Sequence, residues 1–409
     1  KGIEKYIKKY ANDNADWNNL VEILDAETPL DIKEWSQVWV NRWGRAIFTD
    51  RIKYDAQGRI LAFEIEQEAE GKSDNIWPQV FQIGLVYRDN VKVVNVNIKD
   101  RKISLKEVIG QQKPESVVYN YNGFGYGVFP LDGNHLDAIS NLKDEMARAS
   151  SYSNLYENTL IGNIAPIKAF DCFLKGIQTE ENELVLRIAS NNLNSIFWKF
   201  LTEMQQQKVQ PQLEAILYER LQTNLTSNIK KTLFNLFSSI AYSDSAKAKL
   251  YQIWNKETTI PNLKLNQDDY TSIAMNLAIF KHEKADEILN KTRTTITNPD
   301  KQKRFEFLLP SLSKDESVRA AFMESLKEDK NREKEAWVSV GLANINHPLR
   351  QESAQKYIRF SLDLTEEIQR TGDIFFPKDW LNNTIGKYSS KYAFDEVQRF
   401  LKENPNFSP

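Results

Sequence analysis

The hydrophobic pattern of this 409-residue chain changes its period twice, and this constrains the fold more than any other feature. Apolar residues recur at helical spacing in residues 1–43, at every second position across residues 44–130, and at helical spacing again in residues 131–409. The first spacing is typical of amphipathic helices and the second of strands with one buried face. We therefore predict a multi-domain α and β chain: N-terminal helices, a small antiparallel β-sandwich, and a large all-α, solenoid-like helical-repeat domain.

Capping residues support the N-terminal helices. Apolar stripes cover residues 3–10 and residues 17–24, and Asp16 is placed to cap the second of these helices. A third stripe covers residues 32–40 and follows Asp31, another N-cap candidate. Three short helices are therefore predicted before the first strand.

The strand region alternates apolar and polar residues between turn signals. Residues 61–66 and 94–99 alternate in this way, and polar or glycine-containing turns stand at residues 55–58, 70–75 and 88–90. No helical pattern separates these short strands, which favours an antiparallel sandwich over a parallel sheet.

The helical-repeat prediction comes from amphipathic segments separated by short polar breaks. Residues 212–224 and 229–242 lie on either side of one such break and predict an antiparallel helical hairpin. Stacked pairs of this kind build a solenoid with a concave face, although no repeat is strict enough to name from the residues. Similar segments are residues 270–280, 284–292, 317–327, 333–343 and 352–364.

Composition excludes several classes of protein. The 54 Lys and Arg nearly balance the 56 Asp and Glu, so nucleic acid is not an expected partner. The apolar runs are far shorter than the ~20 residues that cross a bilayer.

The single cysteine, Cys172, cannot form an internal disulfide. Because the sequence begins at Lys1 without Met or a leader, we expect it to be part of a larger protein.

The three histidines do not form a metal-binding motif. His282 and Asp286 are four residues apart, but one imidazole and one carboxylate need further ligands to hold a metal. A solvated helix start is the favoured interpretation there. His135 follows Asp132 without a nucleophile signal, and is interpreted as another helix-start residue.

Two other motifs favour structural interpretations. Cys172 lies in an apolar helical stretch, where a thiol packs as a small hydrophobe. Residues 123–127 alternate glycine and aromatic residues, but Pro130 follows closely, so no helix can open where a bound phosphate would need one. These glycines are expected to let a strand bend or pack closely.

Three parts of the chain together resemble the C-terminal portion of aminopeptidase N-type zinc metallopeptidases. Residues 3–20 and 35–48 are similar to the last helices of the catalytic domain and the entry into a β-sandwich. Residues 118–132 are similar to the exit from that sandwich, and residues 380–381 and 392–401 to the closing helices of the helical domain. The resemblance implies a catalytic-domain tail at 1–43, a β-sandwich at 44–130 and a HEAT-like helical domain at 131–409.

The resemblance also implies where the chemistry lies. Family members bind zinc through H-E-x-x-H and a further glutamate, all upstream of the part that this chain resembles. We therefore assign no catalytic or metal-binding residue here, and expect the fragment to be inactive alone. Zinc is expected in the parent protein only, with the upstream catalytic domain and peptide substrates as partners. A secreted or periplasmic parent follows from the family's frequent extracytoplasmic members.

In the family, the helical domain closes over the peptide cleft, where cations would attract a peptide carboxylate. Arg350, Arg359 and Arg370 are the candidates for this contact by residue type, with ordinary surface arginines as the alternative. The alternative function for the whole chain is a stand-alone helical-solenoid module that binds peptide or protein and has no peptidase parent.

Overall fold

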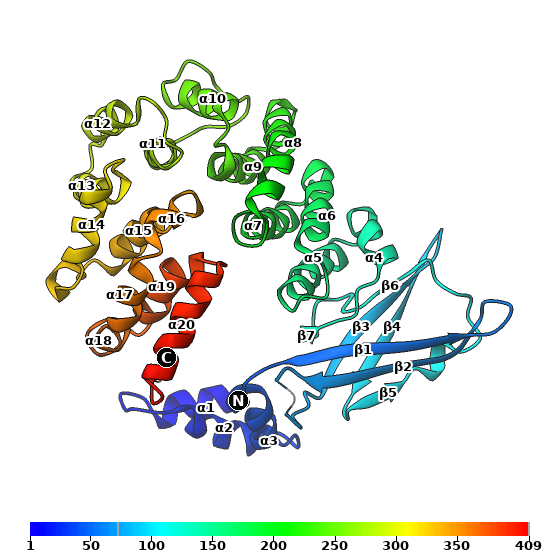
Figure 1. Cartoon of the computed structure of the whole chain (residues 1–409). Helices are drawn as coiled ribbons and strands as arrows, with labels where there is room; N and C mark the ends of the chain where they lie inside the picture. The colour runs from blue at the N-terminus through cyan, green and yellow to red at the C-terminus, as the bar shows by residue number, and fades with distance from the viewer. Residues whose placement is uncertain (72, 408–409) are drawn as a thin grey trace. The chain divides into compact units, whose positions relative to one another are not determined.

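The structure is a computed structural model that describes residues 1–71 and 73–407. The chain forms two compact units, unit 1 (Lys1–Ala165) and unit 2 (Pro166–Pro409) (Figure 1). N-terminal helices, two small sheets and a large all-helical region confirm the predicted fold class. No helix within these described residues is both long and apolar enough to cross a membrane.

Short helices open unit 1: α1 (Gly2–Lys9), α2 (Trp17–Asp25), α3 (Ile32–Ser36) and the π-helical turn η1 (Gln37–Asn41). The Asp16 side chain accepts a hydrogen bond from the backbone N–H of Asn19, whose side chain accepts one from the backbone of Asp16. Asp31 accepts from the backbone N–H of Glu34 at 2.7 Å. These caps start α2 and α3 where the sequence predicts.

Two sheets pack against each other in unit 1, with strand orders β5-β2-β1-β7 and β4-β3-β6. The rings of Phe48, Phe81 and Phe129 meet in the core between them, with centroids 4.6 to 5.4 Å apart. Alternate residues of each long strand supply the rest of this core, as the period of two predicts. The strands are β1 (Ala46–Tyr54), β2 (Ile60–Ala69), β3 (Gln79–Val86), β4 (Val91–Ile98), β5 (Lys102–Ser104), β6 (Ser116–Val118) and β7 (Gly127–Val128), with the turn η2 (Lys106–Val108) after β5.

The glycine-rich stretch at residues 123–127 packs closely against β1, at the point where the chain leaves the sandwich. β7 pairs with β1 in parallel, with Gly127 opposite Ala46, whereas β1–β2, β2–β5, β3–β4 and β3–β6 are antiparallel as predicted. Gly127 has a φ of +146°, and a Cβ there would collide with the carbonyl oxygen of Ala46. Only glycine fits this position, which confirms the close-packing interpretation of these glycines.

Helices after the sandwich complete unit 1: α4 (Gly133–Ala138), η3 (Ile139–Asn141) and α5 (Glu145–Leu160). Asn154 of α5 accepts from the backbone N–H of Phe129 at 2.9 Å and donates to its carbonyl at 3.1 Å. Asn158 donates to the same carbonyl at 3.0 Å. These amides hold α5 against the strand exit, because both helical residues bond the same backbone position.

Secondary structure changes near the predicted boundaries at residues 43/44 and 130/131, while unit 1 continues to Ala165. The backbone N–H of His135 donates to the N-cap Asp132 at 2.7 Å, which confirms His135 as a helix-start residue. Both boundaries remain a prediction as domain limits.

Figure 1 shows unit 2 as a curved row of helices, in which neighbours such as α6 and α7, α8 and α9, and α11 and α12 pack together. The predicted hairpin is α8 and α9, and Cys172 is buried in α6 as expected. The predicted helix at residues 352–364 is instead two shorter helices, α16 and α17. The helices are α6 (Pro166–Thr179), α7 (Glu183–Lys199), α8 (Glu203–Gln222), α9 (Ser227–Ile240), α10 (Asp244–Trp254), α11 (Gln267–Ile279), α12 (Ala285–Thr295), α13 (Pro299–Leu312), α14 (Glu316–Ser325), η4 (Asp329–Asn331), α15 (Glu335–Ile345), η5 (Pro348–Arg350), α16 (Gln351–Ala354), α17 (Tyr357–Asp363), α18 (Thr365–Thr371), α19 (Phe376–Asn383), η6 (Ile385–Lys387) and α20 (Lys391–Glu403).

Polar contacts between successive helix pairs reveal a repeat. Trp198 donates to the carbonyl of Ser239, 41 residues on, and Asn276 donates to the carbonyl of Ser238, 38 residues back. Contacts at such spacings are typical of solenoids built from two-helix repeats.

Candidate functional site

Arg350 lies inside unit 2, at the end of η5. Its guanidinium donates to the carbonyl oxygens of Ser311 at 2.7 Å, Leu312 at 3.0 Å and Asn344 at 3.2 Å. Burial, with a smaller effect of the nearby Arg319, lowers the pKa of Arg350 to about 10. These bonds satisfy carbonyls at the C-terminal ends of α13 and α15 that have no partner within their own helices.

Arg359 is half-buried on α17, and Arg370 is exposed on α18. Arg359 donates to Asp363 at 2.8 Å and Glu403 at 2.6 Å, and these carboxylates raise its pKa. Arg370 lies in the last turn of α18. In the part of the chain that the structure describes, no hydrogen bond or ion pair joins Arg350, Arg359 and Arg370 to one another. Peptide contact by any of them remains a prediction.

His282 and Asp286, the two residues with a possible metal-ligand spacing, have other partners. His282 accepts from the backbone N–H of Lys284 at 3.1 Å and stacks on Tyr251, while Asp286 pairs with Lys314 at 2.6 Å. Within residues 1–71 and 73–407, no three His, Cys, Asp or Glu side chains are grouped so as to hold a metal ion. The described residues therefore offer no set of ligands for a zinc ion.

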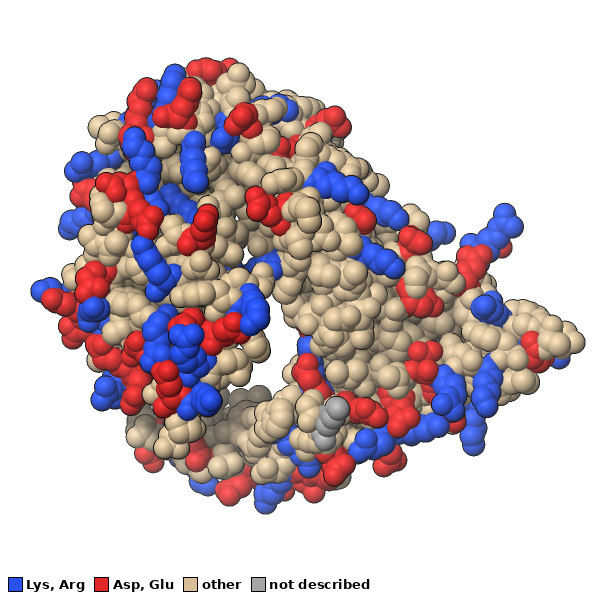
Figure 2. Space-filling model, viewed as in Figure 1, with Lys and Arg blue, Asp and Glu red and all other residues tan. Residues whose placement is uncertain are grey.

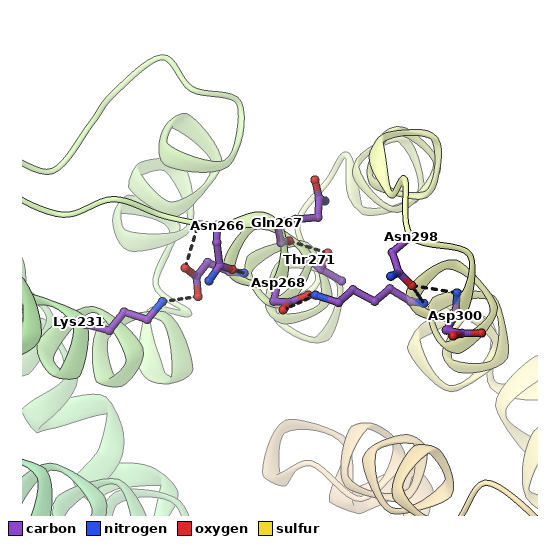
Figure 3. Close-up of polar contacts among 9 residues, drawn as sticks. Lys231, Asn266, Gln267, Asp268, Thr271, Asn298 and Asp300 are labelled. Carbon is purple, nitrogen blue, oxygen red and sulfur yellow. Dashed lines mark hydrogen bonds and ion pairs between the residues drawn. The ribbon is translucent and has the colours of Figure 1, made fainter.

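A row of polar contacts joins the N-terminal ends of α9, α11 and α13 (Figure 3). Lys231 of α9 pairs with Asp269 of α11, and Asp268 of α11 pairs with Lys301 of α13 at 2.7 Å. Asn266 caps α11 by accepting from the backbone N–H of Asp269. Because these carboxylates already have cationic partners, the row acts as a brace between helices. The exposed pair of Asp268 and Lys301 is worth about 0.5 kcal/mol.

An aromatic cluster in unit 2 gathers helix ends that are distant in sequence. The ring of Trp198, at the end of α7, lies 5.5 Å from Tyr242 and 4.7 Å from His347. Phe280 lies 6.3 Å from Tyr242 and 6.1 Å from His347. Sequence reasoning did not connect these residues. Their spacing, about forty residues from Trp198 to Tyr242 and again to Phe280, is the signal that could have done so.

An apolar groove of about 560 Å³ lies in unit 1, between the α3–η1 segment and strands β3 and β4. Its wall includes Leu30, Trp35 and Val80, which are 68%, 48% and 55% exposed. Trp43, just beyond η1, is 72% exposed. Exposed large apolar side chains gathered around a groove mark an interaction surface.

Charges of both signs share the surface. Figure 2 shows Lys and Arg interspersed with Asp and Glu over the face in view. This distribution matches the near-balance of 54 basic and 56 acidic residues, and gives no argument for a polyanionic partner.

Comparison with known proteins decides the family. A family model described as "ERAP1-like C-terminal domain" matches residues 116–408, which is most of the chain. The chain belongs to the ERAP1-like C-terminal domain family. The match begins at β6, so this ERAP1-like region includes the last part of the sandwich as well as the helical unit.

A curated relative links the chain to aminopeptidases. Aminopeptidase N of Streptomyces lividans is 22% identical in an alignment of 198 positions that covers 44% of this chain and 23% of that protein. The aligned region thus spans less than a quarter of the relative's length. Together with the family match, it confirms the resemblance to the C-terminal portion of aminopeptidase N-type proteins, and makes this ERAP1-like domain an aminopeptidase-type accessory domain.

Proposed function

We propose that this chain is the C-terminal accessory region of a zinc-dependent aminopeptidase, and that it shapes and closes the peptide-binding cleft without supplying catalytic residues. The observation that carries the proposal is the ERAP1-like match over residues 116–408. In this proposal the zinc, its ligands and the water-activating carboxylate belong to a catalytic domain of the same polypeptide. Zinc there would polarise the scissile carbonyl and activate water.

The helical unit supports the cleft-shaping role. A curved row of helix pairs presents an extended surface that suits a long ligand such as a peptide. The contacts between successive pairs, and the ion-pair brace from α9 to α13, stiffen this row. A stiff wall discriminates substrates by size, because it does not move aside for a folded protein.

The apolar surface of unit 1 supports docking to the catalytic domain. Ile3 and Ile7 stand one turn apart on α1 and are each 62% exposed, and Trp35 and Trp43 are exposed beyond them in sequence. Covering such side chains would contribute about 25 cal/mol per Å² of apolar area. We infer that the catalytic domain covers the groove beside Trp35.

The first test is to read the parent reading frame upstream of Lys1. An H-E-x-x-H motif with a downstream glutamate supports the proposal. A start codon directly before Lys1, or an unrelated domain, supports the stand-alone binding module instead.

The second test compares the intact parent with a version that ends before Pro166. Values of kcat/KM are measured for an aminoacyl chromogenic substrate, a ten-residue peptide and a folded protein with an accessible N-terminus. We expect the shortened enzyme to lose discrimination against the folded protein and to keep its activity on the chromogenic substrate. Unchanged discrimination would contradict the cleft-closing role.

A further inference from the structure

Strand β4 lies at the edge of the sheet β4-β3-β6. It has eight residues, and its antiparallel register against β3 runs unbroken from Val91 to Ile98. The other strands at the ends of the two sheets are much shorter, with three residues in β5, three in β6 and two in β7. Proteins usually keep edge strands short, charged or interrupted, because a long regular edge is a template for pairing with another strand. The edge of β4 is therefore a candidate docking site.

The hairpin that joins β3 to β4 determines which backbone groups of β4 face this edge. The N–H of Tyr87 donates to the carbonyl of Asn90 at 2.9 Å, so these two residues form a hydrogen-bonded pair, and bonded pairs alternate with non-bonded pairs along the ladder. Asn95 stands at a non-bonded position opposite Gln82, whose N–H donates instead to the side chain of Asn122 at 3.1 Å. The N–H and carbonyl groups of the odd-numbered residues of β4 therefore point away from β3.

These outward-facing backbone groups are available for pairing. Among residues 1–71 and 73–407, none of them has a hydrogen-bond partner. The strand carries no charge between residues 93 and 98, and Val91 and Val93 are 38% and 43% exposed. A regular segment that is rich in β-branched residues and lacks charge, Pro and Gly favours pairing with a further strand.

The two ends of β4 carry charges of both signs. Arg88 and Asp89 form the loop before the strand, Lys99 and Asp100 follow it, and all four residues are exposed. In the part of the chain that the structure describes, none of these four side chains has an ion-pair partner. Each end of the edge thus offers one cation and one carboxylate to a partner.

A second copy of β4 fits this free edge. Two antiparallel strands keep their buried side chains on the same face of the sheet only when residues of the same parity stand opposite each other, so a two-fold axis must pass through a residue position. With the axis at Val94, positions 91–97 of the two copies pair throughout. All the outward-facing residues of both strands then form hydrogen-bonded pairs.

The charges at the strand ends favour this register. In it, Asp89 comes opposite Lys99 of the second copy, and Arg88 comes opposite Asp100 of the second copy. Moving the axis one residue toward the C-terminus would place Arg88 opposite Lys102, so two cations would meet. Cross-strand pairs of opposite charge stabilise a ladder, and like charges destabilise it.

We propose that two copies of this chain associate by antiparallel pairing of their β4 strands, with the two-fold axis at Val94. The pairing makes one continuous sheet in the order β6-β3-β4-β4-β3-β6. Backbone hydrogen bonds supply the affinity, and the charges at the strand ends fix the register. This proposal does not rest on the aminopeptidase assignment, because every contact in it is made by unit 1.

Sedimentation equilibrium of the full chain tests the association. We expect a monomer–dimer equilibrium with a Kd below about 100 µM. N95P removes one outward-facing N–H without removing a bond between β3 and β4, and should weaken the dimer about tenfold. The matched control N95T keeps this N–H and should dimerise like the wild-type chain. The melting temperatures of dilute N95P and N95T show whether the proline is tolerated in the monomer.

Charge reversal tests the register and decides the question if N95P does not fold. D89K should weaken the dimer about fivefold because it places two cations opposite each other, and K99D should do the same by placing two carboxylates opposite each other. An equal mixture of D89K and K99D should regain the wild-type Kd, because a mixed dimer has only opposite charges at these positions. Such a rescue requires contact between two copies in this register.

Three results would overturn the proposal. The first is a wild-type chain that stays monomeric up to about 100 µM. The second is a folded N95P that dimerises as tightly as N95T, which would place the interface on another surface. The third is a mixture of D89K and K99D that associates no more tightly than either variant alone.

Discussion

The fully buried side chains that bond backbone groups include cations in unit 2, whereas in unit 1 they are uncharged. In unit 1, Gln79 accepts from the backbone N–H of Tyr126 and donates to its carbonyl, and Asn120 does the same for Gly125. Among the described residues of unit 1, no Lys, Arg, Asp or Glu is buried. An amide suits these irregular segments because they expose both a donor and an acceptor.

In unit 2, buried cations take this role. Arg319 donates to the carbonyl of Ser313 at 2.7 Å, Lys230 to that of Leu221 at 2.9 Å, and Arg350 to carbonyls at the ends of two helices. The last turn of a helix leaves only carbonyls without partners and carries a partial negative charge. A cation therefore supplies both the donors and the positive charge that such a helix end needs. The polar residues of a core thus depend on which backbone groups it buries: helix ends favour cations, and irregular segments favour amides.

Among the variants that test this comparison, removal of Arg350 should cause the largest loss of stability. R350M leaves the carbonyls of Ser311, Leu312 and Asn344 without this donor, and we expect a loss of about 4 kcal/mol in the free energy of unfolding of unit 2. Urea unfolding measures it. R370M, at an exposed position, should stay within about 0.5 kcal/mol. A loss below about 1 kcal/mol for R350M would show that the cation is dispensable.

Acid should destabilise unit 1 through its buried histidine. Burial, opposed by Asp132, lowers the pKa of His135 from 6.5 to about 4. Because the folded pKa lies below the unfolded one, the stability contribution is complete above pH 6.5 and is lost as the pH falls through 4. The linkage amounts to about 3 kcal/mol.

The measurement is urea unfolding between pH 8 and pH 4, with H135Q as the comparison. Gln can keep a hydrogen bond to Ser151, the partner of the imidazole at 3.0 Å, but does not titrate. The variant should therefore lose less stability on acidification than the wild-type chain. Parallel curves for the two proteins would refute the role of His135.

Loss of an amide in unit 1 should have an intermediate effect. N154A removes the acceptor for the backbone N–H of Phe129, while Asn158 still donates to the Phe129 carbonyl. We expect about 2 kcal/mol of destabilisation and faster hydrogen exchange at the Phe129 amide. Unchanged exchange at that amide would mean that Asn154 is not its essential partner.

The smallest effect is expected at Arg359, an arginine at the surface of unit 2. Arg359 pairs with Asp363 and Glu403 at the surface, where solvent screens the ion pairs. R359M should change the free energy of unfolding by less than about 1 kcal/mol, and added salt should diminish the difference. A salt-independent loss as large as that of R350M would remove the distinction between buried and exposed arginines.

Local signals explain what could be predicted from the sequence. Asp16 and Asp31 cap helices through contacts only three residues away, and the alternation in β2 and β4 reports burial directly. The parallel pairing of Gly127 with Ala46 joins residues far apart in sequence, so periodicity does not contain it.

The candidate site was harder to predict for the same reason. Residue type alone makes Arg350 a candidate, but its partner Ser311 lies 39 residues upstream and reaches it only through helix packing. The resemblance to aminopeptidase N-type proteins rests on whole stretches such as residues 118–132, which carry more information than single residues.

The most direct test of the account is an activity assay of the purified chain alone. It is incubated with zinc and an aminoacyl chromogenic substrate, and hydrolysis is compared with that in buffer containing zinc. We expect no hydrolysis above the buffer rate, because the proposed function places the catalytic groups in another domain. Saturable hydrolysis that a chelator abolishes would contradict it.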